Sequence, residues 1–294
     1  MKKKIIFKGA ATALVTPYKG TRIDYNTLGK LIDSQCEAGI SALVIGGTTG
    51  EAATLSDRER YHLFEFSHER CAGRCPLIFG TGTNDTRVAV RHTERAEKIG
   101  CDGLLLVTPY YNKGTEEGIF RHYRTIANST ELPIILYNVP SRTGVNLGLN
   151  LLARLSEIEN IVALKEASDS CDRLVSLSAL SDKLTLYAGN DSQIYPTLAL
   201  GGAGVISVVS NLFPLYTQKI CTDYFEGRHE ESLSGQISLL PLVRALFLET
   251  NPAPLKYAMS FLGLCRGELR LPLSVVREST KAAIEAALDS IEAE

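Results

Sequence analysis

The sequence lacks several features that define large classes of proteins. Its 294 residues contain no apolar run long enough to cross a membrane, so a membrane-spanning chain is not expected. The 31 basic and 33 acidic residues leave a formal net charge of −2, so no overall positive field attracts nucleic acid. We therefore expect a small-molecule ligand, with neither nucleic acid nor a membrane as a partner.

The sequence also lacks any C-x-x-C pair, although it has seven cysteines. The number is odd and the positions are scattered, so we interpret the cysteines as reduced, buried side chains. Cys71 and Cys75, with His68 nearby, suggest a zinc site, but no second Cys or His pair follows at a ligand spacing. We expect no metal.

A secretion signal is also not expected. The chain begins with MKKKIIFK, in which only three apolar residues follow the basic start before Lys8. This run is too short for the core of a signal peptide. We expect a cytoplasmic protein.

Short runs rich in Val, Ile and Leu alternate with longer stretches of helical periodicity through the first three quarters of the chain. This alternation indicates consecutive βα units. The runs do not alternate with polar residues, which is typical of parallel strands covered on both faces. Eight strands are predicted, at residues 10–16, 42–46, 77–80, 103–107, 134–137, 161–165, 184–188 and 204–208.

Helical segments lie between these strands, several of them after an Asp, Ser or Asn that can cap a helix. Eight βα units predict an α/β fold of the closed (β/α)8 TIM-barrel type. Residues 1–228 are expected to form this barrel, and residues 229–294 a C-terminal helical extension packed on it, with breaks at Pro252, Pro254 and Pro272. No low-complexity linker separates the two parts, so one domain is expected. The clearest predicted helices are residues 25–38, 57–71, 86–99, 116–129 and 215–225.

A doubly wound open sheet that binds a nucleotide is the alternative fold. It is disfavoured because no G-x-G-x-x-G opens a helix after the first strand. Residues 46–51 (GGTTGE) superficially resemble a phosphate-binding loop, but they lack the Lys-Ser/Thr ending that such a loop needs.

Catalytic groups of a barrel project from the carboxyl ends of its strands. Lys165 directly ends the apolar run 161–164, which should point its amine into the mouth of the barrel. A lysine attacks a carbonyl only as the free amine, and burial lowers its pKa from about 10.4 toward the working range. A solvated lysine, or one paired with Glu166, is the alternative interpretation.

Three other strand ends carry unusual polar groups, namely residues 46–51, 108–112 (TPYYN) and 137–144 (YNVPSRTG). Tyr137 ends an apolar run and its phenol can relay protons, although a core aromatic residue gives the same pattern. Thr48 and its neighbour in the Gly-Thr loop either bind a ligand or satisfy a tight glycine turn. A lysine, a tyrosine and a Gly-Thr loop at three strand ends together indicate imine chemistry at a keto acid.

These motifs resemble those of the dihydrodipicolinate synthase and N-acetylneuraminate lyase superfamily over nearly the whole chain. Residues 46–51 are similar to its keto-acid carboxylate loop, residues 137–140 to its tyrosine segment and residues 164–166 to its Schiff-base strand. Arg142 and residues 108–112 resemble the synthase branch rather than the sugar-acid lyases, because a guanidinium near the mouth suits a second substrate carboxylate.

The resemblance implies a pyruvate-dependent condensation with L-aspartate 4-semialdehyde in diaminopimelate and lysine biosynthesis. Lys165 would form a Schiff base with pyruvate, and Tyr137 would shuttle protons with Thr48 and with Tyr111 from a neighbouring subunit. The expected assembly is a homotetramer built as a dimer of dimers. No cofactor is expected, because the iminium withdraws the electrons that a metal would otherwise withdraw.

The same resemblance assigns the substrate-binding residues. Thr49, Gly189 and Ile206 would line the pyruvate pocket, and Arg142 would bind the carboxylate of the acceptor. Sialic acid or a 2-keto-3-deoxy sugar acid is the alternative substrate, against which Arg142 argues. A catalytically silent keto-acid sensor and an isomerase that binds phosphate at residues 201–204 (GGAG) are further alternatives; neither gives a role to the full set of polar residues.

Two departures from the family pattern stand out. Many synthases have proline where this chain has Gly114, which should leave the loop after Tyr111 less restrained. Lysine-inhibited bacterial members bind lysine through histidines and a glutamate, and the matching positions here are Asp57, Arg60 and Val88. We expect weak or absent feedback by lysine.

Overall fold

The computed structural model describes residue 3 and residues 5–292. Part of the basic start used in the secretion argument, residues 1, 2 and 4, lies outside the described residues, as does the end of the extension, residues 293–294. Among the described residues, no helix combines the length and the apolar character that crossing a membrane requires.

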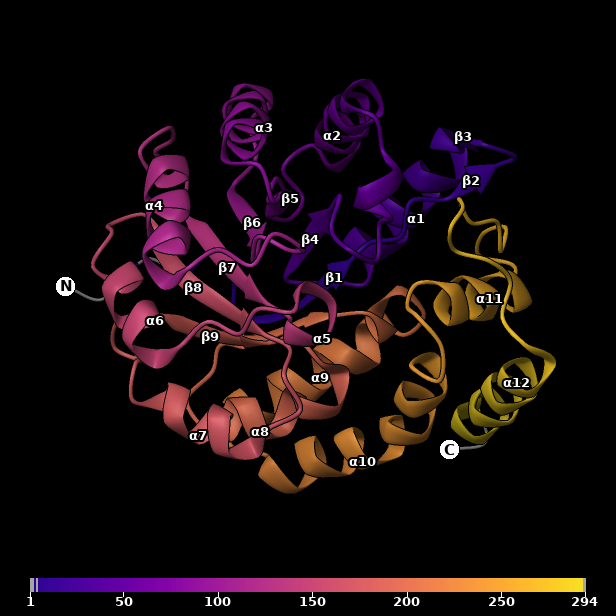
Figure 1. The fold of residues 1–294 in the computed structure, drawn as a ribbon. Coiled ribbons are helices and arrows are strands. Elements are labelled where there is room, and N and C mark those ends of the chain that lie inside the picture. The colour runs from indigo at the N-terminus through magenta and orange to yellow at the C-terminus, as the bar shows by residue number, and fades with distance from the viewer. Residues whose placement is uncertain (1–2, 4, 293–294) are drawn as a thin grey trace.

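Within the described residues, eight parallel strands close into a barrel in the order β1-β10-β9-β8-β7-β6-β5-β4, with helices on the outside (Figure 1). This confirms the predicted (β/α)8 barrel and its eight strands, whose ends shift by at most three residues. A two-stranded hairpin, β2 (Tyr18–Lys19) and β3 (Arg22–Ile23), follows the first strand. The barrel strands are β1 Gly9–Ala13, β4 Ala42–Ile45, β5 Leu77–Gly80, β6 Gly103–Val107, β7 Ile134–Asn138, β8 Ile161–Glu166, β9 Thr185–Ala188 and β10 Gly204–Ser207.

The predicted helices are also confirmed, and three of them, α1, α2 and α3, begin at the Asp or Ser caps that were expected. Ser56 and Glu59 form a reciprocal capping box at the start of α2, and Asp85 accepts a hydrogen bond from the first turn of α3. The helices are α1 Tyr25–Glu37, α2 Asp57–Cys71, α3 Thr86–Ile99, α4 Glu116–Ala127, α5 Pro140–Thr143, α6 Leu149–Ser156, α7 Cys171–Ser178, α8 Ile194–Ala199, α9 Pro214–Phe225, α10 His229–Leu246, α11 Ala253–Phe261 and α12 Glu278–Glu292.

Successive strand residues point alternately into the barrel and out to the helices. Val44, Ile78 and Leu105 belong to the cluster that fills the barrel. The amino-terminal end of the barrel is closed by Phe7, whose ring stacks on Tyr187 with centroids 4.2 Å apart. The two cavities described below lie at the opposite end, where the strands finish.

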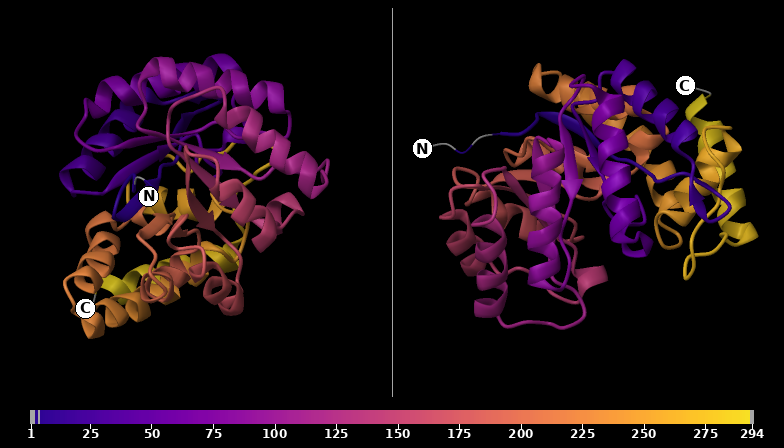
Figure 2. Two further views of the ribbon diagram at one scale, coloured as in Figure 1. Left: turned by 90° about the vertical axis from the view of Figure 1, so that its left-hand side faces the viewer. Right: turned by 90° about the horizontal axis from the view of Figure 1, so that it is seen from above.

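The C-terminal helices α10, α11 and α12 gather on one flank of the barrel (Figures 1 and 2). The predicted break at Pro252 is confirmed, since the chain leaves helix between α10 and α11, and Pro254 lies in the first turn of α11, where proline is tolerated. Lys256 of α11 forms a fully buried ion pair with Glu51 of the loop after β4. The extension is thereby attached directly to one of the loops at the mouth of the barrel.

Candidate active site

Lys165 and Tyr137 are neighbours in register on the adjacent strands β8 and β7. Both side chains point into the barrel, and Lys165 Nζ lies 4.3 Å from the centroid of the Tyr137 ring. Lys165 is only 5% exposed. The alternative that Lys165 pairs with Glu166 is wrong, because Glu166 pairs with Arg173 at 3.0 Å instead.

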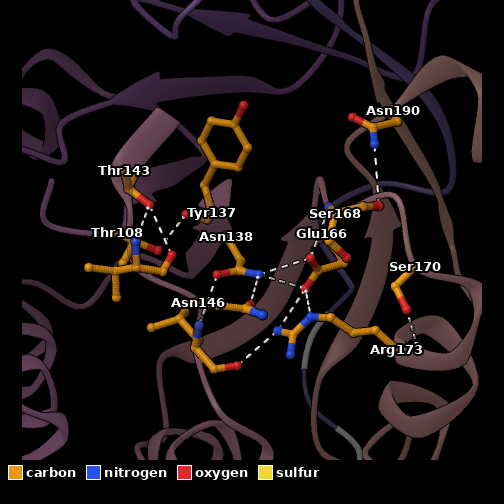
Figure 3. Close-up of polar contacts among 12 residues, drawn as sticks. Thr108, Tyr137, Asn138, Thr143, Asn146, Glu166, Ser168, Ser170, Arg173 and Asn190 are labelled. Carbon is orange, nitrogen blue, oxygen red and sulfur yellow. Dashed lines mark hydrogen bonds and ion pairs between the residues drawn. The ribbon is translucent and has the colours of Figure 1, made fainter. Parts of the chain in front are cut away.

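A buried polar network lies on the outer face of the strands that carry Lys165 and Tyr137. The fully buried carboxylate of Glu166 accepts hydrogen bonds from Asn138 Nδ2 at 2.9 Å, from the backbone N–H of Ser168 at 3.1 Å and from Arg173 Nε at 3.0 Å. Figure 3 shows these groups converging on the carboxylate while the Tyr137 ring points away from them. Asn138 and Glu166 are partners in register, so the network ties together the two strand ends that carry Tyr137 and Lys165.

The Gly-Thr loop after β4 forms another side of the site. Gly46 has a φ of +69°, and a Cβ there would lie 2.8 Å from the Phe64 ring, so the turn requires glycine. This turn brings the half-buried Thr48 and the buried Thr49 to the cavity. The buried pair of Glu51 with Lys256 fixes the end of the loop, and burial lowers the pKa of the Lys256 amine.

These elements surround a cavity of about 530 Å³ at the carboxyl end of the strands. Gly189 permits close packing there, since a Cβ would lie 2.6 Å from the carbonyl oxygen of Glu166. The cavity is large enough for two small acids. Six of the residues predicted for the site line it, namely Thr48, Thr49, Tyr137, Arg142, Lys165 and Gly189.

Two predicted residues do not line this cavity. Ile206 is fully buried in the cluster that fills the barrel. Tyr111 is 89% exposed and has a φ of +73°, a conformation that a bulky residue seldom adopts. Within one chain, therefore, the Tyr111 phenol is not brought to Lys165.

Arg142 lies at the rim of the cavity, in the short helix α5. Its Nη2 donates a hydrogen bond of 2.9 Å to the backbone carbonyl of Asn251. A carbonyl carries no full charge, so the positive charge of the guanidinium remains available to a ligand carboxylate.

Asn251 and Asp191 are among the residues of the cavity wall that sequence reasoning missed. Asn251, between α10 and α11, donates to Thr49 Oγ1 at 3.0 Å. Asp191 follows β9 and accepts from the backbone N–H groups of Val208 and Val209 through one oxygen, while its buried Oδ1 has no partner. Burial raises the pKa of the Asp191 carboxyl, and the positive charge of Lys165 opposes that shift. Neither residue ends an apolar strand run, so the strand-end rule does not select it.

A second cavity of about 340 Å³ adjoins the first and shares Thr48, Tyr137 and Arg142 with it. Arg60 lines this cavity and is buried, with its guanidinium donating to the carbonyl oxygens of Gly80 at 3.1 Å and Ala52 at 2.8 Å. Burial lowers the pKa of Arg60. The wall of this cavity is therefore cationic at the Arg60 position.

A buried amine beside a phenol and a threonine, under a guanidinium at the cavity rim, is an arrangement suited to imine chemistry on a keto acid. Comparison with known proteins identifies relatives with a function that fits this arrangement. The chain is 44% identical over 286 residues to the 4-hydroxy-tetrahydrodipicolinate synthase of Clostridium novyi, covering 97% of each protein.

Similar solved structures belong to synthases of the same name or of the dihydrodipicolinate synthase name. The 4-hydroxy-tetrahydrodipicolinate synthase of Methylacidiphilum fumariolicum SolV superimposes with a TM-score of 0.96 at 41% identity, covering 99% of this chain and 97% of that one. The dihydrodipicolinate synthase of Acinetobacter baumannii, solved in complex with pyruvate, superimposes with a TM-score of 0.94 at 38% identity, covering 97% and 99%. Residues 6–291 match the model of the dihydrodipicolinate synthetase family, and the chain therefore belongs to that family.

Proposed function

We propose that this protein is a Schiff-base-forming lyase that condenses pyruvate with L-aspartate 4-semialdehyde to give 4-hydroxy-tetrahydrodipicolinate, in diaminopimelate and lysine biosynthesis. Membership of the family and the names of relatives that match over almost their whole length support this activity rather than the cleavage of sialic acid or a keto-deoxy sugar acid. The observation that carries the proposal is the position of the Lys165 amine, buried in the cavity and 4.3 Å from the centroid of the Tyr137 ring.

The reaction begins when Lys165 Nζ adds to the keto carbon of pyruvate. The keto oxygen leaves as water, and the resulting iminium withdraws electrons from the neighbouring methyl group. Loss of a methyl proton then gives an enamine. Because the iminium is itself the electron sink, the mechanism requires no metal and no organic cofactor.

The enamine carbon next attacks the aldehyde carbon of L-aspartate 4-semialdehyde, and the aldehyde oxygen takes up a proton to become the hydroxyl group of the product. The amine of the bound semialdehyde attacks the imine carbon, displaces Lys165 Nζ and closes the ring. Arg142 binds the carboxylate of the semialdehyde through its free guanidinium donors. A sugar aldehyde has no carboxylate to offer it.

Proton transfer is assigned to Tyr137, Thr48 and Tyr111, and the pyruvate pocket to Thr49, Gly189 and Ile206. Tyr137 and Thr48 line the cavity together with Lys165, which supports their roles. Ile206 is buried in the barrel below, so it would act by shaping the floor of the pocket.

Tyr111 acts in the site of a neighbouring subunit. Its exposure and its left-handed backbone support this role, because strained conformations are usually retained where they serve a function. Activity then requires at least a dimer, and we propose a homotetramer built as a dimer of dimers. A cytoplasmic location belongs to the same proposal, supported by seven cysteines that are all free thiols.

The test is to reduce the purified protein with borohydride in the presence of pyruvate and to locate the adduct by peptide mass spectrometry. Wild-type protein and Lys183→Ala, which lacks an exposed lysine paired with Glu157, should both carry the adduct at Lys165, and Lys165→Ala should carry none. Consumption of pyruvate with the semialdehyde, with N-acetylmannosamine and with glyceraldehyde then identifies the acceptor. An adduct at another lysine, or preference for a sugar aldehyde, would overturn the proposal.

A further inference from the structure

Three cysteine side chains meet at the amino-terminal end of the barrel, away from the active site. Cys71 ends α2, Cys75 lies just before β5, and Cys36 comes from the last turn of α1, which packs beside α2 (Figure 1). The Sγ atoms are 4.0 Å (Cys36 to Cys71), 3.8 Å (Cys36 to Cys75) and 3.7 Å (Cys71 to Cys75) apart. Within the part of the chain that the structure describes, this is the only group of three potential metal ligands in mutual reach.

The triangle has the dimensions of a thiolate metal site. With metal–sulfur bonds of about 2.3 Å, sulfur atoms are about 3.8 Å apart in a tetrahedral site and about 4.0 Å apart in a trigonal one. The three observed separations fall on these values. An ion could therefore bind with only small movements of the side chains, whereas a disulfide requires its two sulfur atoms to approach to about 2.05 Å.

The charges around the triangle favour thiolates. Asp33 pairs with both Arg70 and Arg74, and Arg74 Nε donates to the carbonyl oxygen of Cys71 at 3.0 Å. The positive charge of Arg74 therefore lies beside the site, where it offsets part of the negative charge of three thiolates around an ion.

We propose that Cys36, Cys71 and Cys75 form a binding site for a thiophilic metal ion, Zn²⁺ or the softer Cu⁺, through three thiolates. Each thiol gives up its proton as it binds, so up to three protons are released per ion and no electron is transferred. The ion links α1, α2 and the start of β5. Because the active site lies at the other end of the barrel, the metal stabilises the fold and takes no part in the condensation.

The sequence suggested Cys71 and Cys75 with His68, and we expected no metal because the ligand set was incomplete. The third side chain is Cys36, which is far from Cys71 along the chain, and His68 is not in the group. Cys36 is also the most accessible of the three thiols, which gives an ion a path to the buried pair.

The experiment titrates chelator-treated, reduced wild-type oligomer with Cd²⁺, the spectroscopic probe for thiolate sites, and then with Zn²⁺ and Cu⁺ as competitors. Thiolate-to-cadmium charge transfer in the ultraviolet should saturate at about one ion per chain, with release of protons and a rise in the melting temperature. The rate of the condensation should not change.

Matched variants identify the site. Cys36→Ser should lose the charge-transfer band and the thermal shift, and Cys101→Ser, which removes a buried cysteine outside the group, should keep both. Wild-type protein without the band, a band of unchanged intensity in Cys36→Ser, or oxidation of two of the thiols to a disulfide in place of metal binding would each overturn the proposal.

Discussion

The side-chain amide of Asn251 donates a hydrogen bond of 3.0 Å to Thr49 Oγ1, while its backbone carbonyl accepts from Arg142. One buried residue of the extension therefore positions both residues that are proposed to bind the substrate carboxylates. We expect Asn251→Ala to raise the KM for pyruvate and to lower kcat/KM for pyruvate about 10- to 100-fold, since leaving a buried polar group without its partner costs on the order of 1–3 kcal/mol. The KM for the semialdehyde should change less, because alanine keeps the backbone carbonyl that Arg142 contacts. Steady-state kinetics with each substrate varied in turn measures this.

Asn128→Ala is the control, because Asn128 is exposed at the end of α4, away from the cavity. Its KM values should equal those of the wild type. If Asn251→Ala lowered kcat alone and left the KM for pyruvate unchanged, the proposed positioning of Thr49 by Asn251 would be wrong.

The second prediction concerns the carboxylate of Glu166. Glu166→Ala leaves the guanidinium of Arg173, which is only 13% exposed, without its fully buried partner, and breaking a buried pair typically costs about 3–5 kcal/mol. Glu166→Gln keeps an acceptor for Asn138 and should cost less. Urea unfolding measures both losses, with Asp172→Ala, at an exposed acid in the first turn of α7, as a control expected to lose about 1 kcal/mol or less. Equal losses for Glu166→Ala and the control would contradict this reading of the network.

The third prediction concerns Tyr111, whose phenol is exposed on its own chain. Lys165→Ala and Tyr111→Phe should each have little activity as pure oligomers. Coexpressed hybrids should regain activity, because a Tyr111→Phe protomer still has Lys165 and receives a tyrosine from its Lys165→Ala neighbour. A hybrid of Lys165→Ala with Tyr137→Phe should stay inactive, since both residues belong to one cavity. If the hybrids of Lys165→Ala and Tyr111→Phe were no more active than the two pure variants, Tyr111 would not act in the site of a neighbouring subunit.

The barrel could be predicted from the sequence because each strand is a short apolar run. A run such as 161–164 also marks clearly where its strand ends and which side chain stands at that end. Lys165 and Tyr137 were found in this way, since residues at strand ends must reach the mouth of the barrel. Asn251, Asp191 and Cys36 could not be found by the same rule. Asn251 and Asp191 are placed by the packing of loops and of α10 and α11, and Cys36 by the packing of α1 on α2, which bring together residues that are distant in the chain.

The wall of the cavity also contains residues whose positions could not be predicted from the sequence. Leu240, Val243 and Phe247, from α10 and the residue after it, line the cavity, although the sequence indicated only an added helical layer. Helical periodicity shows that a face is apolar, but not which surface it covers.

The fourth prediction is a loss of stability at mildly acid pH. Burial, with a contribution from the charge of Arg60, lowers the pKa of His92 to about 4, and burial lowers the pKa of His122 to about 4. The unfolded chain titrates near the ordinary value of about 6.5 and so binds more protons than the native state between these values. Stability is complete above about pH 6.5 and falls as the pH is lowered toward 4. Urea midpoints at about pH 7 and about pH 5 should show this decrease.

Replacing the two histidines should flatten that dependence. The double variant His92→Gln/His122→Gln removes both groups, and glutamine can still bond to Tyr61 and Thr86, the present partners of the two imidazoles. His62→Gln, at an exposed histidine, should leave the decrease as it is in the wild type. An unchanged decrease in the double variant would mean that other groups cause it.

The fifth prediction is weak or absent inhibition by lysine. Arg60 presents a guanidinium to the second cavity, Val88 offers no carboxylate, and Asp57 is paired with Arg91 at 3.2 Å. The ammonium groups of lysine would therefore find neither a histidine nor a glutamate at these three positions, and the one carboxylate among them already has a partner. Because binding at 1 mM needs only about 4 kcal/mol, inhibition at low millimolar lysine would contradict this account. Initial rates at saturating pyruvate, measured over increasing lysine, give the answer.

A gain of function tests the cause of this insensitivity. Val88→Glu supplies the missing carboxylate among these three positions and should increase sensitivity to lysine, whereas Val175→Glu, at an exposed position on α7, should not. If Val88→Glu stays insensitive while it folds and turns over normally, the Arg60 charge alone is enough to exclude lysine. Val88→Glu combined with Arg60→His should then become sensitive, because the fixed positive charge is removed and a neutral imidazole takes its place.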